Sequence, residues 1–112
     1  MKTARPQGDP FDALGDPYRR AIVQLLRGGA RSVQAIADEL PISRPAVSRH
    51  LRLLKRAGLV STTPRGTLRL YQLDDLGARA VRDYLERVWG EALGRYQLVA
   101  ENTRARRTRG HR

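Results

Sequence analysis

SVQAIADELPISRPAVSRHLRLLKRAGLV, residues Ser32 to Val60, is the stretch that decides the fold of this chain. Its pattern predicts a short helix from Val33 to Glu39, a tight joint, and a longer helix that Ser43 caps. Pro45 falls in the first turn of the longer helix, where proline costs little because its missing N–H would have no partner there. Gly58 ends this second helix as the residue after its C-cap.

The second helix has two different faces when its residues are placed at about 100° intervals. One face is polar or cationic and comprises Arg44, Pro45, Ser48, Arg49, Arg52, Lys55 and Arg56. The other is mainly apolar and comprises Ala46, Val47, His50, Leu51, Leu53, Leu54 and Ala57. No acid interrupts the first face, although cations three and four residues apart repel each other. A helix that lies against a polyanion explains this face better than a solvated helix, and the major groove of B-DNA admits one.

Four sequence blocks together resemble the winged helix-turn-helix of ArsR-type bacterial repressors. They are DPYRRAIVQLL (Asp16–Leu26), SVQAIADEL (Ser32–Leu40), ISRPAVSRHLRLLKRAGLV (Ile42–Val60) and RGTLRLYQL (Arg65–Leu73). The resemblance implies a mainly α fold with a small β-hairpin wing, in which the N- and C-terminal helices form a dimer interface. Pro41 stands where the family usually has glycine. Because proline cannot take φ > 0, the joint must turn differently, with Leu40 extended.

The length and composition of the chain limit what it can be. Its 112 residues make one small domain, whose incomplete burial suggests a core shared between subunits. The absence of cysteine excludes disulfides and thiolate chemistry. Without a membrane-length apolar stretch or a hydrophobic signal region, we expect a cytoplasmic, nucleoid-associated protein. The expected parts are a disordered arm (1–8), the winged domain with its C-terminal dimerisation helix (9–100) and a basic disordered tail (101–112).

The net charge of +11 is concentrated in two places. Leu40 to Leu73 holds seven Lys or Arg and no acid, and Asn102 to Arg112 holds five Arg and no acid. The remainder is nearly neutral, with ten basic and eleven acidic residues. This distribution is typical of a nucleic-acid-binding protein. The terminal cluster is equally compatible with weak attraction to DNA and with a solubilising end.

Segments on either side of the two helices complete the expected domain. Asp9-Pro10 opens a helical turn, Phe11 to Leu14, and Asp16-Pro17 opens a helix that runs to about Arg27. Further on, Leu59 to Thr63 and Thr67 to Leu73 predict a β-hairpin joined through Pro64-Arg65-Gly66. Charged tips are common on ordinary surface hairpins. Since this hairpin directly follows the basic helix, we favour a wing whose Arg65 and Arg69 contact phosphates.

The last helix should begin after Asp74-Asp75 and run from Leu76 to about Ala100, with acids at its N-terminus as the helix dipole favours. Its apolar stripe contains the only tryptophan of the chain, and aromatic residues are enriched at interface cores. A stripe this wide favours a dimer interface over a purely intramolecular core. The predicted interface residues are Phe11, Leu14, Val81, Leu85, Val88, Trp89, Ala92 and Tyr96.

Metal and catalytic chemistry have few candidates in this chain. His50 falls within the apolar side of the second helix, which favours a packed, hydrogen-bonded histidine over a metal ligand. Metal-sensing members of the resembling family carry thiolates where this chain has Ile36 to Glu39. Others use Asp and His on the last helix, which here has Asp83 and Glu86 but no histidine. We expect no metal and no cofactor, and the lack of a catalytic constellation argues against an enzyme.

Three functions remain to be separated. The leading one is a homodimeric repressor of a palindromic double-stranded operator, with Ser48, Arg49 and Arg52 at base edges. Phosphate contacts would then come mainly from Arg44, Lys55, Arg65 and Arg69. The alternatives are a non-specific architectural nucleic-acid binder and a winged helix that binds an acidic protein. The sequence does not specify the operator, the regulated genes, an inducing signal, or activation as opposed to repression.

Overall fold

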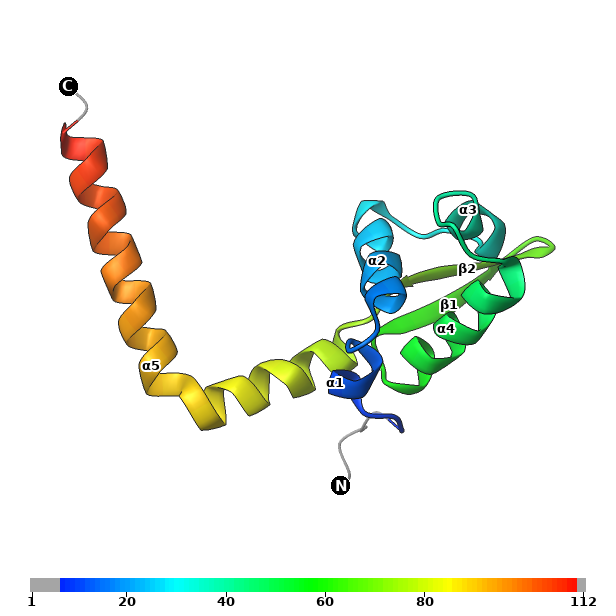
Figure 1. The fold of residues 1–112 in the computed structure, drawn as a ribbon, viewed down its shortest axis with the longest axis horizontal. Coiled ribbons are helices and arrows are strands. Elements are labelled where there is room, and N and C mark those ends of the chain that lie inside the picture. Colours follow the sequence, from blue (N-terminus) through cyan, green and yellow to red (C-terminus); the bar gives the residue numbers. More distant parts are fainter. Residues whose placement is uncertain (1–6, 111–112) are drawn as a thin grey trace. The chain divides into compact units, whose positions relative to one another are not determined.

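The structure is a computed structural model that describes residues 7–110; side chains are described up to residue 95, except that of residue 93. The chain divides into two compact units, Met1–Val81 and Arg82–Arg112. The elements are α1 (Pro10–Ala13), α2 (Pro17–Leu25), the 3₁₀ turn η1 (Leu26–Gly28), α3 (Val33–Ala37), α4 (Arg44–Arg56), β1 (Val60–Arg65), β2 (Leu68–Leu73) and α5 (Asp75–Gly110) (Figure 1). The mainly α architecture with a two-stranded hairpin confirms the predicted fold class.

Side-chain caps start the helices of the first unit. The Asp9 carboxylate accepts from the N–H of Phe11 at 2.9 Å, and Asp16 accepts from Tyr18 at 2.8 Å. The Ser43 hydroxyl accepts from the N–H of Ala46 at 3.3 Å, so the start of α4 is where the sequence predicted it. Each cap satisfies an N–H that has no partner inside its helix.

The core of the first unit lies between the helices and the hairpin. Ile22 of α2 and Ile36 of α3 are fully buried against the inner side of α4, where Val47, Leu51 and Leu54 are also fully buried. Leu53 was predicted to share that apolar side, but it is 39% exposed. Leu53 lies about 120° around the helix from Val47, at the edge of the apolar side. The core covers only the centre of that side, so Leu53 stays exposed.

The joint between α3 and α4 is short and contains no left-handed residue. α3 ends at Ala37, earlier than predicted, and the N–H groups of Glu39 and Leu40 donate to Ile36 at 3.0 Å and to Ala37 at 3.3 Å. Among residues 7–110, only glycines have positive φ. The turn at Pro41 is therefore made without positive φ, which confirms that part of the prediction.

The hairpin has a tighter turn than the sequence indicated. Val60 pairs with Leu73 and Arg65 with Leu68, which leaves only Gly66 and Thr67 in the turn. Gly66 has φ +61°, as the first central position of a type II′ turn requires. Pro64, predicted to lie in the turn, pairs with Arg69 inside the ladder. Both strands of a two-stranded sheet are edges, which is where a proline without an N–H is tolerated.

The junction between α4 and α5 is tightly packed. Gly58 has φ +72°, the left-handed conformation expected after a helix C-cap. Its carbonyl accepts from the N–H of Gly77 at 2.8 Å, in the first turn of α5. A Cβ on Gly77 would overlap the carbonyl oxygen of Ala57 and the side chain of Leu59. Because Gly77 has no side chain, the first turn of α5 can approach the end of α4 closely.

The two ends of the described chain differ from the predictions. Residues 1–6 of the predicted arm lie outside the described residues, while Gly8 donates its N–H to Arg56 at the end of α4 at 2.8 Å. α5 continues to Gly110, so residues 101–110 are helical where the sequence predicted disorder beyond about Ala100. Arginine and alanine favour helix, and no proline or glycine interrupts residues 101–109. Between residues 7 and 110, no helix is long and apolar enough to cross a membrane.

Candidate DNA-binding surface

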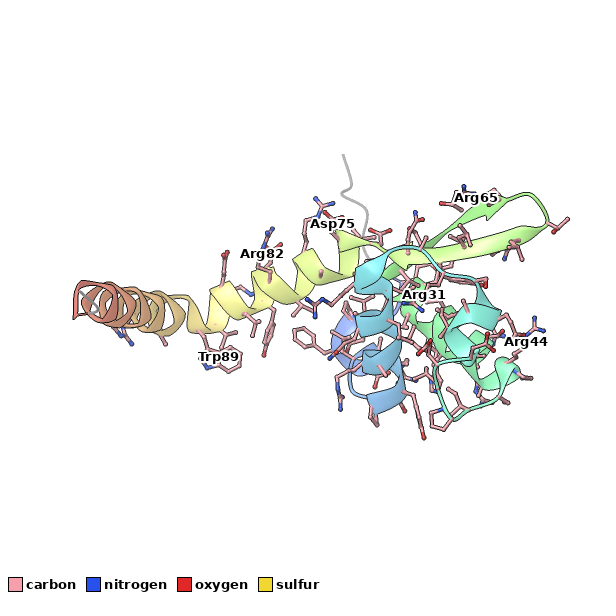
Figure 2. All side chains as sticks on the ribbon, turned by 90° about the horizontal axis from the view of Figure 1, so that it is seen from above. Arg31, Arg44, Arg65, Asp75, Arg82 and Trp89 are labelled. Atoms are coloured by element: carbon pink, nitrogen blue, oxygen red, sulfur yellow. The ribbon has the colours of Figure 1, made fainter. Side chains whose placement is uncertain are left out.

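The outer side of α4 is a continuous cationic surface. We call it the basic face and define it by its five exposed cations, Arg44, Arg49, Arg52, Lys55 and Arg56. Pro45 is exposed beside them, and Ser48 is half-buried. Figure 2 shows the Arg44 side chain pointing outward at the start of the helix. The buried inner side of α4 fixes which residues face outward, and so converts the sequence pattern into a surface.

The cations of the basic face have no acidic partner among the described side chains. The ion pairs among the described side chains are Arg79–Asp75 at 3.1 Å and Arg82–Asp83 at 3.9 Å, and both are on α5. Lys55 donates from Nζ to the hydroxyl of Thr62 at 3.4 Å. Four arginines with unneutralised charge on one helix face attract a polyanion strongly, because clustered charge raises the local potential.

The hairpin adds two further exposed cations. Arg65 is the last residue of β1 and sits next to the Gly66-Thr67 turn, and Arg69 pairs with Pro64 across the ladder. Figure 2 labels Arg65 near the end of the hairpin. The hairpin follows α4 directly, and the Lys55–Thr62 hydrogen bond joins the two elements. Helix and hairpin thus present their cations from one compact unit.

A polar cluster contacts α4 on the side away from the basic face. Its central residue, Arg19, was not predicted from the sequence. Arg19 of α2 donates from Nε to the carbonyl of Ala13 at 2.7 Å and from Nη2 to that of Asp12 at 3.4 Å. Its Nη1 lies 3.3 Å from Nδ1 of His50 on α4. The half-buried His50 is therefore packed and hydrogen-bonded, as predicted. No local pattern relates Arg19 to a residue thirty-one positions away.

The electrostatics of this cluster keep His50 neutral and Asp16 charged. Burial lowers the pKa of His50 below 6.5; the Asp16 carboxylate opposes this shift, while the cations of Arg19 and Arg49 add to it. For Asp16, burial would raise the pKa, but hydrogen bonds from the N–H groups of Arg19 and Tyr18 lower it below 3.8. The Tyr18 and His50 rings lie with centroids 6.2 Å apart.

The predicted dimer residues are distributed over both units. In the first unit Phe11 is 44% exposed, while Leu14 and Val81 are half-buried. In the second unit the exposed stripe of α5 comprises Leu85 (36%), Val88 (51%), Trp89 (48%) and Ala92. The side chain of Tyr96 lies outside the described part. The structure contains one chain, so the interface stays a prediction.

The described residues also bear on what a metal site or a ligand pocket would need. Within the described residues, no group of three or more His, Cys, Asp or Glu side chains is placed to hold a metal ion. An open, largely apolar hollow of about 320 Å³ lies between α2, the base of the hairpin and the start of α5. Sequence reasoning found no such pocket, because its walls come from segments far apart in the chain. Its lining residues are Val23, Leu59, Leu73, Asp74, Asp75 and Ala78.

Comparison with known proteins agrees with this geometry. A family described as a helix-turn-helix domain matches residues 14–63. The HTH-type transcriptional regulator Rv2034 of Mycobacterium tuberculosis is 49% identical over 100 residues, 88% of this chain and 94% of that protein. The transcriptional repressor SdpR of Bacillus subtilis is 41% identical over 64 residues, 57% of this chain and 71% of that protein. The solved structure of an ArsR-like transcriptional regulator from Rhodococcus sp. RHA1 is 30% identical, with a TM-score of 0.66, and the match covers 81% of this chain and 86% of that one.

Two helices joined by a tight turn, a following hairpin and an exposed basic face define a winged helix-turn-helix DNA-binding protein. With the relatives above, the chain belongs to the ArsR-type family of winged helix-turn-helix transcriptional regulators. It is therefore a DNA-binding regulator of transcription and not an enzyme.

Proposed function

We propose that this chain is a homodimeric transcriptional repressor that binds a palindromic operator through α4. The observation that carries the proposal is the basic face, with its exposed cations and no acidic partner among the described side chains. A helix of this kind fits the major groove, and two copies related by a dyad would read half-sites about one helical turn apart. The name of the relative SdpR, a transcriptional repressor, favours repression over activation.

The residues of this surface divide by the part of DNA that each would meet. Arg49 and Arg52 are centred on the outward side of α4 and, with the half-buried Ser48 just before Arg49, are proposed to contact base edges. Arg44, at the helix start, and Lys55, in the last turn, are proposed to bind phosphates. Pro45, next to Arg44, is proposed to lie against the DNA as well. Arg65 and Arg69 of the hairpin would bind backbone phosphates, which position the protein without specifying sequence.

The proposed dimer interface is the apolar stripe of α5 together with α1. Trp89 and Val88 are about half exposed in the single chain, and large apolar side chains exposed together favour a protein–protein contact. Trp89 packs edge-on against Tyr84 at a centroid distance of 6.0 Å, which gives the stripe an ordered aromatic surface. Phe11 of α1 is a second exposed aromatic residue in the proposed interface.

In the deciding experiment, the full chain selects duplexes from a randomised pool. The affinity for the selected duplex is then measured in competition with random-sequence duplex. We expect a dyad-symmetric sequence to be enriched and the complex to contain two chains per duplex. Equal binding to all duplexes would support the architectural alternative instead. No duplex binding, with capture of acidic protein, would support the interaction module.

We also propose that repression in the cytoplasm needs no metal and no cofactor. The described residues offer no cluster of three metal-ligating side chains, and the chain has no cysteine. Adding Zn²⁺ or a chelator should leave the Kd for the selected duplex unchanged. A shift of about tenfold with either reagent, equivalent to about 1.4 kcal/mol, would contradict a metal-independent regulator.

A further inference from the structure

The Arg19 guanidinium connects three helices. It projects from α2, donates to the carbonyls of Ala13 and Asp12 at the end of α1, and lies 3.3 Å from Nδ1 of His50 on α4. Arginine presents several donors in a rigid planar fork, so one side chain can fix the relative orientation of several acceptors. The contact reaches α4 on the side opposite the basic face.

Directional contacts of this kind are scarce on α4. Val47, Leu51 and Leu54 bury the helix through apolar packing, which is strong but non-directional. The described hydrogen bonds from side chains of α4 to another element are those of His50 with Arg19 and of Lys55 with Thr62, and the second is exposed. The backbone bond from Gly8 to the Arg56 carbonyl holds only the last turn of α4. The part-buried Arg19–His50 contact is thus the side-chain contact suited to set the rotation of the helix.

We infer that Arg19 is a positioning residue for DNA reading, which acts through His50 to set the rotation of α4 and so aims the basic face. The inference rests on the proposed sequence-specific binding. A helix rotated by a small angle would keep its general attraction for phosphates but misplace the side chains at base edges, where geometry is strict. Loss of Arg19 should therefore reduce specificity more than overall DNA affinity.

The chemistry of the contact specifies a protonation state. Arginine only donates, so Nδ1 of His50 must accept, and the imidazole must be neutral with its proton on Nε2. Burial lowers the pKa of His50, and Arg19 and Arg49 lower it further against the opposing Asp16 carboxylate, so the acceptor is present at neutral pH. Protonation of His50 removes the acceptor and places a second cation opposite Arg19.

Arg20 is a matched control within the same helix. It also lies on α2 and donates from Nη1 to a carbonyl at the end of α1, that of Leu14, at 2.8 Å. None of the described hydrogen bonds of Arg20 reaches α4. Replacing Arg20 by methionine thus removes a comparable charge and a comparable bond to α1 while leaving the link to the DNA-reading helix intact.

The test measures Kd for the duplex that the wild-type chain selects from a randomised pool, and for random-sequence duplex, well below the melting temperature of each variant. Arg19→Met and His50→Leu should each weaken binding to the selected duplex about tenfold, with little change for random duplex. The double variant should be no worse than either single one, because both remove the same contact. Arg20→Met should stay within about twofold of wild type.

Two further measurements separate positioning from simple stabilisation. His50→Gln keeps a carbonyl acceptor and should restore specificity that His50→Leu loses, even if Arg19→Met proves unstable.

In the wild type, the ratio of selected to random affinity should fall as the pH drops through the pKa of His50, while His50→Gln should show no such fall. The ratio cancels the general effect of added positive charge. Asp16 does not titrate in that window because its pKa lies below 3.8.

Failure of this inference can be distinguished from failure of the proposed function. If the wild-type chain enriches no sequence, specific binding itself fails. If it does enrich one, but Arg19→Met keeps wild-type discrimination, the double variant is additive, or the wild-type ratio is flat with pH, then Arg19 does not position α4.

Discussion

Arg49 and Arg65 are both exposed arginines, yet they belong to elements that would meet DNA differently. Arg49 lies within α4, on the side away from the buried Val47, Leu51 and Leu54. Arg65 lies beside a two-residue turn at the end of a hairpin. An arginine that reads guanine through O6 and N7 contributes about 1–3 kcal/mol of base discrimination, whereas a phosphate contact contributes none directly.

We predict that Arg49→Ala weakens binding to the selected duplex while sparing random duplex. Arg65→Ala should weaken both about equally, and it should reduce the slope of log K against log salt by about one unit for each phosphate that the variant no longer binds. Titrations of both variants at several salt concentrations measure these effects. If selected and random binding weaken in the same proportion in both variants, Arg49 does not read bases, and the architectural alternative gains support.

His50 also predicts how stability depends on pH. Burial lowers its pKa in the folded chain below 6.5, so the unfolded chain binds the proton more readily. The free energy of unfolding should therefore be highest above pH 6.5 and fall as the pH decreases from there through the lowered pKa. His50→Gln should remove this fall, as urea titrations at a series of pH values would show. A wild-type stability that is constant between pH 7 and about 5 would contradict the burial of a neutral imidazole.

Elements in the first unit are joined closely at the end of α4. Gly8 donates to Arg56, Gly58 takes a left-handed conformation, and Gly77 at the start of α5 approaches the backbone of Ala57. The first turn of α5 is thus anchored to the end of the DNA-reading helix by backbone contact, which cannot yield as a flexible side chain does.

We predict that Gly77→Ala destabilises the chain although alanine favours helix. The gain in helix propensity is about 1 kcal/mol, whereas overpacking against the carbonyl of Ala57 costs about 1–3 kcal/mol. A net loss of about 1 kcal/mol would lower the melting temperature by about 4–8 °C in a domain of this size. Gly28→Ala is the control, because a Cβ there meets nothing within 4 Å. Equal melting temperatures for the two variants would show that the junction relaxes freely.

Two surfaces matter at the scale of the described chain. Cations are exposed on α4 and the hairpin, and the apolar residues Leu85, Val88 and Trp89 are exposed along α5. A chain of 112 residues buries a limited core, so an apolar stripe of this size favours association between copies. Dimerisation would also double the number of DNA-reading helices on one palindromic site.

We predict that Leu85→Asp produces monomers with weakened operator binding, because it would bury an unpaired carboxylate in the interface. Sedimentation and binding to the selected duplex measure the two effects. Glu86→Gln changes the charge by one unit in the same turn, away from the stripe, and should remain dimeric. A Leu85→Asp variant that stays dimeric would move the interface elsewhere.

The local properties of this chain were predictable from its sequence because they depend on neighbouring residues. Caps at Asp9, Asp16 and Ser43 start helices, glycine at position 58 ends one, and the spacing of apolar residues decides which side of α4 carries the cations. The order of helix, joint, helix and hairpin followed from these signals. So did the class of ligand, since an uninterrupted row of cations favours a polyanionic partner.

Only the tertiary structure decided what depends on residues far apart in the chain. It exposed Leu53, moved the hairpin turn to Gly66-Thr67, and placed Arg19 between α1 and His50. It also formed the apolar hollow beside α2 and the close approach at Gly77. Periodicity specifies the direction in which a side chain points, but packing determines which distant residue it meets there. That is why the exposed, cationic side of α4 could be predicted and the contact of His50 with Arg19 could not.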